Sequence, residues 1–307
     1  MSKVKKTVII PGYRCNNNCL FCLNIHKRNS IPQETTLQIK KEMIEAKNSG
    51  TTYLELVGGE MSIRPDIIEL IKFAKQMGFK TIMMSTNGRM YSYDKFAKKI
   101  VRAGLNSLVF SIHGHNAELH DFLTQVPGSF EQLKKGIENV RKAGLKNIGS
   151  NTTIVKQNYK RLPKIGRLIY SLGIRNSEFI FVDPTYGAAH DDFYKFVPKI
   201  SEAAPYIRKC LDIGKIHKVP HWLVRYIPLC YFTDYLDQIS ELQEVAFFHT
   251  EHLAPDFENR DVERSRRVVS RAKAEKCKSC QFYNKCEGIW KEYLVHYGDK
   301  ELNKIVK

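Results

Sequence analysis

Three cysteines stand within eight residues in the stretch Cys15-Asn16-Asn17-Asn18-Cys19-Leu20-Phe21-Cys22, which follows the apolar, strand-like run Val8-Ile9-Ile10. A loop of this kind can turn its three thiols toward one soft metal centre. Three protein ligands would leave one iron of a four-iron cluster free to bind a substrate or cofactor. Structural zinc is the alternative, but it usually takes four protein ligands, and only His26 stands close enough to be a fourth. A disulfide is disfavoured because three close cysteines cannot all pair among themselves.

Outward from this stretch, strand-length apolar runs alternate with helical patterns as far as about residue 182. The runs cover residues 8–10, 53–57, 81–84, 108–112, 151–155 and 178–182. Between them, Pro65 is placed as a first-turn proline, and Ser129 with Gln132 is read as a capping box. Strands that alternate with helices predict a parallel sheet with right-handed crossovers. Six units are fewer than the eight of a closed barrel, so we predict an α/β fold with a partial (β/α)6 TIM-like barrel.

The pattern changes after a helix predicted near residues 197–216. From about Lys218 onward the chain is rich in aromatic residues and shows no strand–helix rhythm. We therefore predict two domains, a partial barrel over residues 1–216 and a small cysteine-rich module over residues 217–307.

Polar and glycine-rich motifs stand where the predicted strands end, which is the ligand-binding edge of parallel α/β folds. Gly58-Gly59-Glu60 follows the second strand, where two glycines allow a close backbone approach and the glutamate offers a carboxylate. Generic tight turns would explain Gly58-Gly59-Glu60 and Ser85-Thr86-Asn87-Gly88 equally well. The other candidates at this edge are Ser111, in Ser111-Ile112-His113-Gly114, and Asn151 and Thr153 on the fifth strand.

A second group of cysteines lies near the carboxyl terminus. Cys277-Lys278-Ser279-Cys280 is followed by Cys286, and Cys230 is the best candidate for a fourth ligand. Four ligands would close the site, so it would serve electron relay or structure, with either an iron–sulfur cluster or zinc as its metal.

The composition describes an ordinary globular chain, with 43% hydrophobic and 26% charged residues. No apolar run is long enough to span a bilayer and none resembles a signal peptide, so we expect a cytoplasmic protein that does not bind membranes. Eight cysteines then point to metal or redox chemistry. The net charge of +17 would attract an acidic peptide or a nucleic acid, and it is densest over residues 260–278.

The cysteine pattern CxxxCxxC after a first strand resembles that of the radical S-adenosylmethionine (radical SAM) enzymes. The resemblance implies that Cys15, Cys19 and Cys22 hold a 4Fe–4S cluster whose open iron binds S-adenosylmethionine (SAM), and that reductive cleavage of SAM yields a 5′-deoxyadenosyl radical. It also implies a low-potential electron donor such as flavodoxin or ferredoxin. The positions that match the family's cofactor-binding residues are Phe21, Gly58, Gly59, Glu60, Ser85, Asn87, Ser111, Asn151 and Thr153.

The order of motifs resembles the family branch with a C-terminal auxiliary-cluster domain of the SPASM or twitch type. That branch implies a second 4Fe–4S cluster on Cys230, Cys277, Cys280 and Cys286, and therefore favours iron–sulfur over zinc. Two departures are visible: His113 replaces the usual aspartate, and Glu287–Glu292 lacks a further cysteine, so one auxiliary cluster is expected.

The resemblance predicts an enzyme that abstracts a hydrogen atom from a peptide or protein side chain, as maturases do. Cys210, which has no assigned ligand role, could donate a hydrogen atom to a substrate radical or could be an ordinary buried cysteine. Two alternatives remain: a tRNA- or cofactor-modifying radical SAM enzyme, and a non-catalytic zinc or iron–sulfur protein.

Overall fold

The computed structural model describes residues 3–306; the remaining ends of the two predicted domains lie outside the described residues. Its main feature is a curved nine-stranded sheet with the strand order β7-β6-β5-β4-β3-β2-β1-β8-β9. The strands of this sheet are β1 (Val4–Ile9), β2 (Tyr53–Leu56), β3 (Thr81–Thr86), β4 (Ser107–Ser111), β5 (Asn147–Ile154), β6 (Asn176–Phe181), β7 (His221–Arg225), β8 (Phe248–Ala254) and β9 (Phe257–Asn259). All neighbouring pairs are parallel except β8 and β9.

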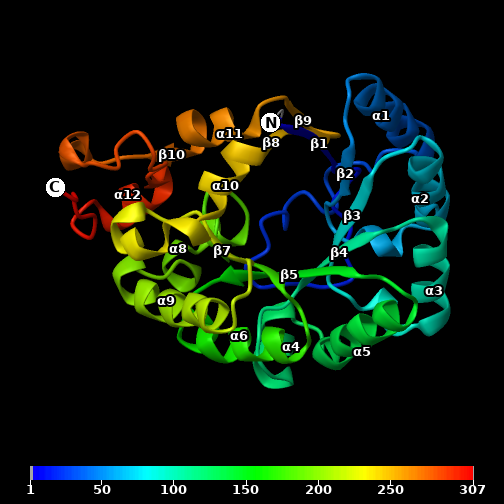
Figure 1. Ribbon diagram of the computed structural model, residues 1–307, viewed down its shortest axis with the longest axis horizontal. Coiled ribbons are helices and arrows are strands. Elements are labelled where there is room, and N and C mark those ends of the chain that lie inside the picture. The colour runs from blue at the N-terminus through cyan, green and yellow to red at the C-terminus, as the bar shows by residue number, and fades with distance from the viewer. Residues whose placement is uncertain (1–2, 307) are drawn as a thin grey trace.

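Helices follow one another around the outside of this sheet, as Figure 1 shows for α1, α2, α3, α5 and α6. The helices are α1 (Thr36–Asn48), α2 (Ile67–Gln76), α3 (Asp94–Ala103), α4 (Ala117–Thr124), α5 (Ser129–Lys142), α6 (Leu162–Ser171), α7 (Ala188–Asp191), α8 (Phe193–Phe196), α9 (Ile200–Ile216), α10 (Ser240–Phe247), α11 (Val262–Ser265) and α12 (Lys291–Tyr297). The buried faces of most of these helices form the core with the strands, which confirms the predicted α/β partial barrel. Within residues 3–306, no helix is both long and apolar enough to cross a membrane.

The sheet does not end at residue 216. β7 pairs with β6 and β8 pairs with β1, so two strands from the predicted C-terminal module extend the barrel at both edges. The remaining C-terminal chain, with α11, the short strands β10 (Arg271–Ala272) and β11 (Ile289–Trp290), and α12, lies at one side of the barrel (Figure 1). Sequence periodicity missed β7 and β8 because their runs are interrupted by charged and histidine residues, such as Arg225 and His252.

Two predicted helix starts were wrong. Pro65 lies before the N-cap residue of α2, Asp66, so it is outside the first turn. The N-cap residue of α5 is Gly128, at φ +81°, and no capping box forms with Ser129. Instead, Asp121 accepts hydrogen bonds from the backbone N–H groups of Gly128 and Phe130 and from the Ser129 hydroxyl. These bonds lower the pKa of Asp121. They also give a hydrogen-bond acceptor, from a residue of α4, to the free backbone N–H groups at the start of α5.

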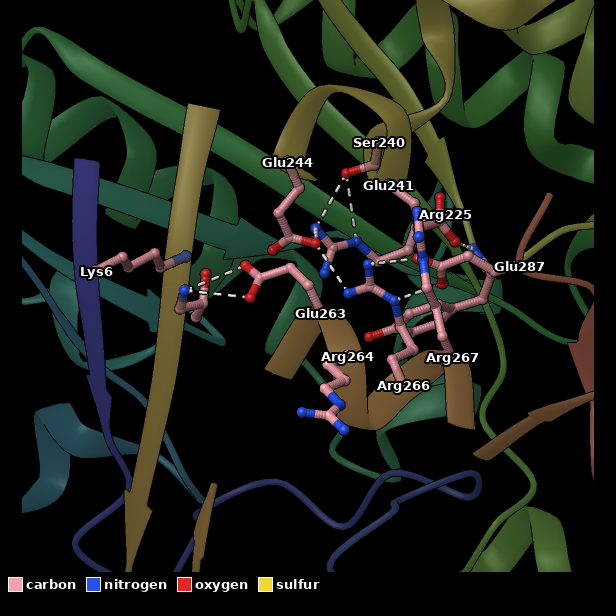
Figure 2. Close-up of polar contacts among 12 residues, drawn as sticks. Lys6, Arg225, Ser240, Glu241, Glu244, Glu263, Arg264, Arg266, Arg267 and Glu287 are labelled. Carbon is pink, nitrogen blue, oxygen red and sulfur yellow. Dashed lines mark hydrogen bonds and ion pairs between the residues drawn. The ribbon is translucent and has the colours of Figure 1, made fainter. Parts of the chain in front are cut away.

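A buried ionic network fills the gap between β7 and β8. Arg225 of β7 pairs with Glu178 at 2.8 Å and with Glu244 of α10 at 3.3 Å. Arg266 pairs with Glu244 at 2.9 Å and makes two hydrogen bonds to Glu287, of 2.7 and 3.0 Å. Figure 2 shows these guanidinium groups lying between the carboxylates. The nearby arginines hold the pKa of Glu244 down to about 2, despite its burial.

Replacing Glu287 with glutamine should lower the free energy of unfolding by about 1.5–3 kcal/mol, because Arg266 would keep its buried charge and its pair with Glu244 but lose the charged partner that binds it in a bidentate way. Urea denaturation of the variant and the parent chain measures this difference. Lys98→Gln, which breaks the half-exposed pair with Asp94, is the control and should change stability by no more than ~0.5 kcal/mol. Equal losses in the two variants would contradict the role of the network.

Candidate active site

The three clustered cysteines share one cavity at the carboxyl edge of the sheet. Its volume is about 470 Å³, and Cys15, Cys19 and Cys22 line it from the loop after β1. Burial raises the pKa of Cys19 to about 12, and the nearby thiols of Cys15 and Cys22 add to this rise. All three are free of disulfides.

Hydrogen-bond donors surround the sulfur atoms. Asn17 donates its backbone N–H to Cys15 Sγ at 3.3 Å, and Arg28 Nη2 lies 3.5 Å from Cys22 Sγ. Asn87 Nδ2 lies 3.8 Å from Cys15 Sγ. N–H groups directed at sulfur stabilise thiolate ligands and tune the metal that they hold. Three sulfur ligands with such donors fit an iron–sulfur cluster with one open iron.

The cofactor-binding residues that the sequence predicted line this same cavity. They come from five separate segments at the ends of β1 to β5: Phe21, Gly58, Gly59, Glu60, Ser85, Asn87, Ser111, Asn151 and Thr153. The structure therefore brings together all nine residues and the three cysteines. Their roles toward a cofactor stay predictions.

Gly58 and Gly59 have a structural role that the sequence did not reveal. A Cβ atom on Gly58 would lie 2.3 Å from the carbonyl oxygen of Gly12, and one on Gly59 would lie 2.0 Å from that of Arg14. The backbone N–H groups of Gly59 and Glu60 donate to these same two carbonyls. The two glycines therefore allow the cysteine loop to approach closely and to bind to the end of β2.

The Glu60 carboxylate is only 3% exposed and ties two of the strand-end loops together. Its Oε1 accepts from the backbone N–H of Ser62 at 3.1 Å and from the Thr86 hydroxyl at 2.8 Å. Its Oε2 accepts from the backbone N–H of Asn87 at 2.6 Å. Burial raises the pKa of Glu60 and the hydrogen bonds oppose that rise. The carboxylate is held rigidly in the cavity wall.

His113, which replaces the usual aspartate of the family, is a residue of the cavity wall. Its ring meets Phe21 edge-on, with centroids 4.9 Å apart, and its Nδ1 accepts from the backbone N–H of Thr153 at 3.3 Å. Burial lowers the pKa of His113 to about 3, so the ring is neutral near pH 7 with its proton on Nε2. Its position just after β4, close to Ser111, is the sequence feature that could have indicated a cavity residue.

Sequence reasoning also missed several residues of the same wall. They are Tyr13, Arg28, Ile180, Val182, Asp183 and Tyr226. Asp183 follows β6, lies in the cavity wall, and has its pKa raised by burial. Tyr226 comes from the loop after β7, a strand that the sequence pattern did not predict.

Cys210 does not line this cavity. It lies in α9, is 0% exposed, and packs so closely on Gly166 that a Cβ on that glycine would be 2.8 Å from the Cys210 sulfur. Burial raises the pKa of its thiol well above the ordinary range. This placement argues against the predicted hydrogen-atom donor and corresponds to the alternative, a buried core cysteine.

Cys210→Ala should therefore leave the chemistry of the site unchanged and cost about 1 kcal/mol of stability through lost packing. Urea denaturation and an assay of SAM cleavage measure the two effects separately. A large loss of turnover with unchanged stability would restore Cys210 to the chemistry.

The C-terminal cysteines form a second, separate site. Cys230, Cys277, Cys280 and Cys286 line one small cavity. Backbone N–H groups donate to the sulfur atoms, from Leu229 and Gly288 to Cys286 at 3.5 and 3.3 Å, and from Ile305 to Cys280 at 3.4 Å. Four thiols with such donors fit a closed metal centre, and both an iron–sulfur cluster and zinc suit this ligand set.

The similarities to known proteins agree with this geometry. Residues 9–169 match the radical SAM superfamily. Over 173 residues the chain is 34% identical to an AdoMet-dependent heme synthase of Methanosarcina barkeri, covering 56% of this chain and 48% of the synthase. Over 221 residues it is 28% identical to a probable GTP 3′,8-cyclase of Saccharolobus islandicus, covering 69% of this chain and 67% of the cyclase.

Among solved structures, the chain is similar to Streptococcus suis SuiB bound to its precursor peptide SuiA. The match covers 96% of this chain and 73% of the SuiB chain. The TM-score is 0.67 at 16% sequence identity, a likeness of fold. The chain spans about half the length of the heme synthases that it matches.

Proposed function

Because the chain belongs to the radical SAM superfamily, we propose that it is a maturase-type enzyme that removes a hydrogen atom from a peptide or protein side chain. The observation that carries the proposal is the convergence of three cysteines and nine predicted cofactor residues on one cavity, with a second four-cysteine site in the same chain. When bound, the 4Fe–4S cluster and SAM implied by the family would supply an electron and a 5′-deoxyadenosyl radical.

The chain's own residues would hold and shield these groups. Cys15, Cys19 and Cys22 would ligate the cluster, while Glu60, fixed by its hydrogen bonds, would offer a carboxylate to the ammonium group of SAM. Buried apolar groups such as Phe21 and Val182 would exclude water, which protects a reactive radical from side reactions.

Support for a peptide substrate comes from architecture. The likeness to SuiB, whose structure contains a precursor peptide, covers 96% of the chain. The sequence matches to a heme synthase and a GTP cyclase instead favour a second candidate, modification of a small cofactor-like molecule.

Part of the positive charge of residues 260–278, on which the nucleic-acid alternative depends, is paired with acids or buried. Arg266 and Arg267 pair with Glu287, Arg260 pairs with Glu251 and Glu258, and Arg271 is buried. A phosphate backbone therefore cannot reach Arg266 or Arg271, whereas the side chains of Arg260 and Arg267, although paired, are 55% and 41% exposed.

Anaerobic reconstitution with iron, sulfide and a reductant tests the enzyme class. We expect 5′-deoxyadenosine from SAM, and its formation should rise when the true substrate is added. No 5′-deoxyadenosine from a protein with a full cluster content would reject the proposal. Stimulation by GTP or a tetrapyrrole, but by no peptide, would favour the second candidate.

Cys277→Ala tests the second site. We expect the reconstituted variant to lose the iron and sulfide of one four-iron cluster and to keep substrate-independent SAM cleavage, because the first site lies on separate elements. Metal analysis of the parent and the variant measures this change. Unchanged iron with a loss of zinc would assign zinc to the second site.

A further inference from the structure

A second cavity adjoins the proposed cofactor cavity. It has a volume of about 350 Å³. The two cavities share part of their walls, namely Tyr13, Leu23, Asn24, Val57, Gly58, Asp183 and Tyr226. We call this second cavity the aromatic chamber. A group bound there would lie beside anything bound in the cofactor cavity.

Five aromatic rings line the aromatic chamber: Tyr13, Tyr186, Tyr226, Phe257 and Trp290. Their exposure is graded. Tyr186 is 51% and Phe257 39% exposed, whereas Tyr13 and Trp290 are each 2% exposed. The rings thus run from the protein surface to the interior. Aromatic walls of this kind favour an apolar or aromatic ligand group over a strongly hydrated one.

The cations on the wall already have protein partners. Lys27 pairs with Asp256 at 2.7 Å, and its ammonium lies 5.1 to 5.5 Å from the ring centroids of Tyr13, Phe257 and Tyr186. Arg266 is held by Glu244 and Glu287 in the network of Figure 2. Burial lowers the pKa of His252 to about 4, which leaves it neutral near pH 7. An anionic ligand such as a triphosphate would have to displace these partners.

Trp290, a ring of the inner wall, carries a buried hydrogen-bond donor without an acceptor among the described residues, and Arg271, which stacks on that ring but is not part of the lining, carries two more. Within residues 3–306, the Trp290 indole N–H and two N–H positions of Arg271, Nε and Nη1, have no hydrogen-bond partner. The Arg271 guanidinium lies 4.9 Å from the Trp290 ring centroid. An unsatisfied buried donor is unfavourable, so a ligand with an acceptor would be stabilised here. Glu241 and Glu287 already lie near the Arg271 guanidinium and offset its charge, which favours a neutral acceptor such as an amide carbonyl.

We propose that the aromatic chamber binds an uncharged aromatic side chain of a peptide substrate, with a neighbouring amide carbonyl as its acceptor. This inference rests on the proposed function and names the substrate class for the same site. The aromatic residue enters between Tyr186 and Phe257, and the shared wall at Tyr226 places it beside the cofactor cavity.

The chain contains two tryptophans, which gives a binding assay with an internal control. Trp290 lines the aromatic chamber, whereas Trp222 is fully buried in the core and lines neither cavity. Holoenzyme labelled with 5-fluorotryptophan is titrated with N-acetyl-L-tyrosine amide and observed by fluorine NMR. We expect a saturable shift of the Trp290 resonance alone, and no shift with N-acetyl-L-lysine amide.

The outcomes are distinct. No Trp290 shift with the tyrosine amide, or a saturable shift with GTP in its place, would overturn the inference. The assay needs no SAM cleavage, so it can succeed or fail independently of 5′-deoxyadenosine formation, which tests the proposed function.

Two variants locate the binding site. Tyr186→Ala removes a half-exposed ring, whereas Trp290→Phe keeps a ring but removes the indole N–H donor. Each variant should bind radiolabelled N-acetyl-L-tyrosine amide about tenfold more weakly, as measured by equilibrium dialysis. Tyr93→Ala, at an exposed tyrosine before α3 that lines neither cavity, is the matched control and should bind normally. Unchanged binding in Tyr186→Ala, or an equal loss in Tyr93→Ala, would contradict the assignment.

Discussion

Cys19→Ala should abolish both the first iron–sulfur cluster and all formation of 5′-deoxyadenosine from SAM. The loop after β1 supplies three thiols to one cavity, and loss of one leaves too few ligands for the cluster. Iron and sulfide analysis after anaerobic reconstitution, together with chromatography of the nucleoside product, measures the effect.

The matched control for Cys19→Ala is the same cysteine-to-alanine change at a position outside the cavity. Cys210→Ala should retain the full cluster content and SAM cleavage, because Cys210 lies in the core of α9. A Cys19→Ala protein that still holds both clusters and cleaves SAM would refute the assignment of the N-terminal cysteines.

Glu60→Gln is expected to weaken SAM binding by about 10- to 150-fold, which corresponds to the ~1.5–3 kcal/mol of a hydrogen bond to a charged group. The variant lacks the charge that would attract the SAM ammonium. Its amide NH₂ would also face backbone N–H donors now satisfied by the carboxylate. Equilibrium dialysis of SAM with the reconstituted holoenzyme gives the affinity.

Stability must be measured beside the affinity, because Glu60 also braces two loops. Glu251→Gln is the matched control: this glutamate is 2% exposed, lies on β8, and accepts a hydrogen bond from Thr7, but it lines neither cavity. Glu251→Gln should destabilise the fold and leave SAM affinity unchanged. Equal affinity losses in both variants would show that Glu60 acts only through the fold.

Much of the candidate site could be predicted because strand ends are local features of the sequence. Apolar runs located β1 to β6, and the residues that follow parallel strands must meet at one edge of the sheet. Cys15, Glu60, Asn87 and Ser111 could therefore be assigned to one site before their contacts were known. The same reasoning placed His113 beside Ser111 but could not tell a loop position from a cavity wall, because burial depends on what packs against the ring.

The sequence by itself determined the partial barrel, the order of its first six strands and the two groups of clustered cysteines, because periodicity and spacing are properties of neighbouring residues. Only the tertiary structure decided that β7 and β8 extend the sheet, that Gly58 and Gly59 dock the cysteine loop, and that Tyr226 and Trp290 line a chamber beside it. These features depend on contacts between residues far apart in the chain. In sequence, Arg266 belongs to the segment with the densest positive charge, and only folding brings Glu244 and Glu287 close enough to pair with it in the interior.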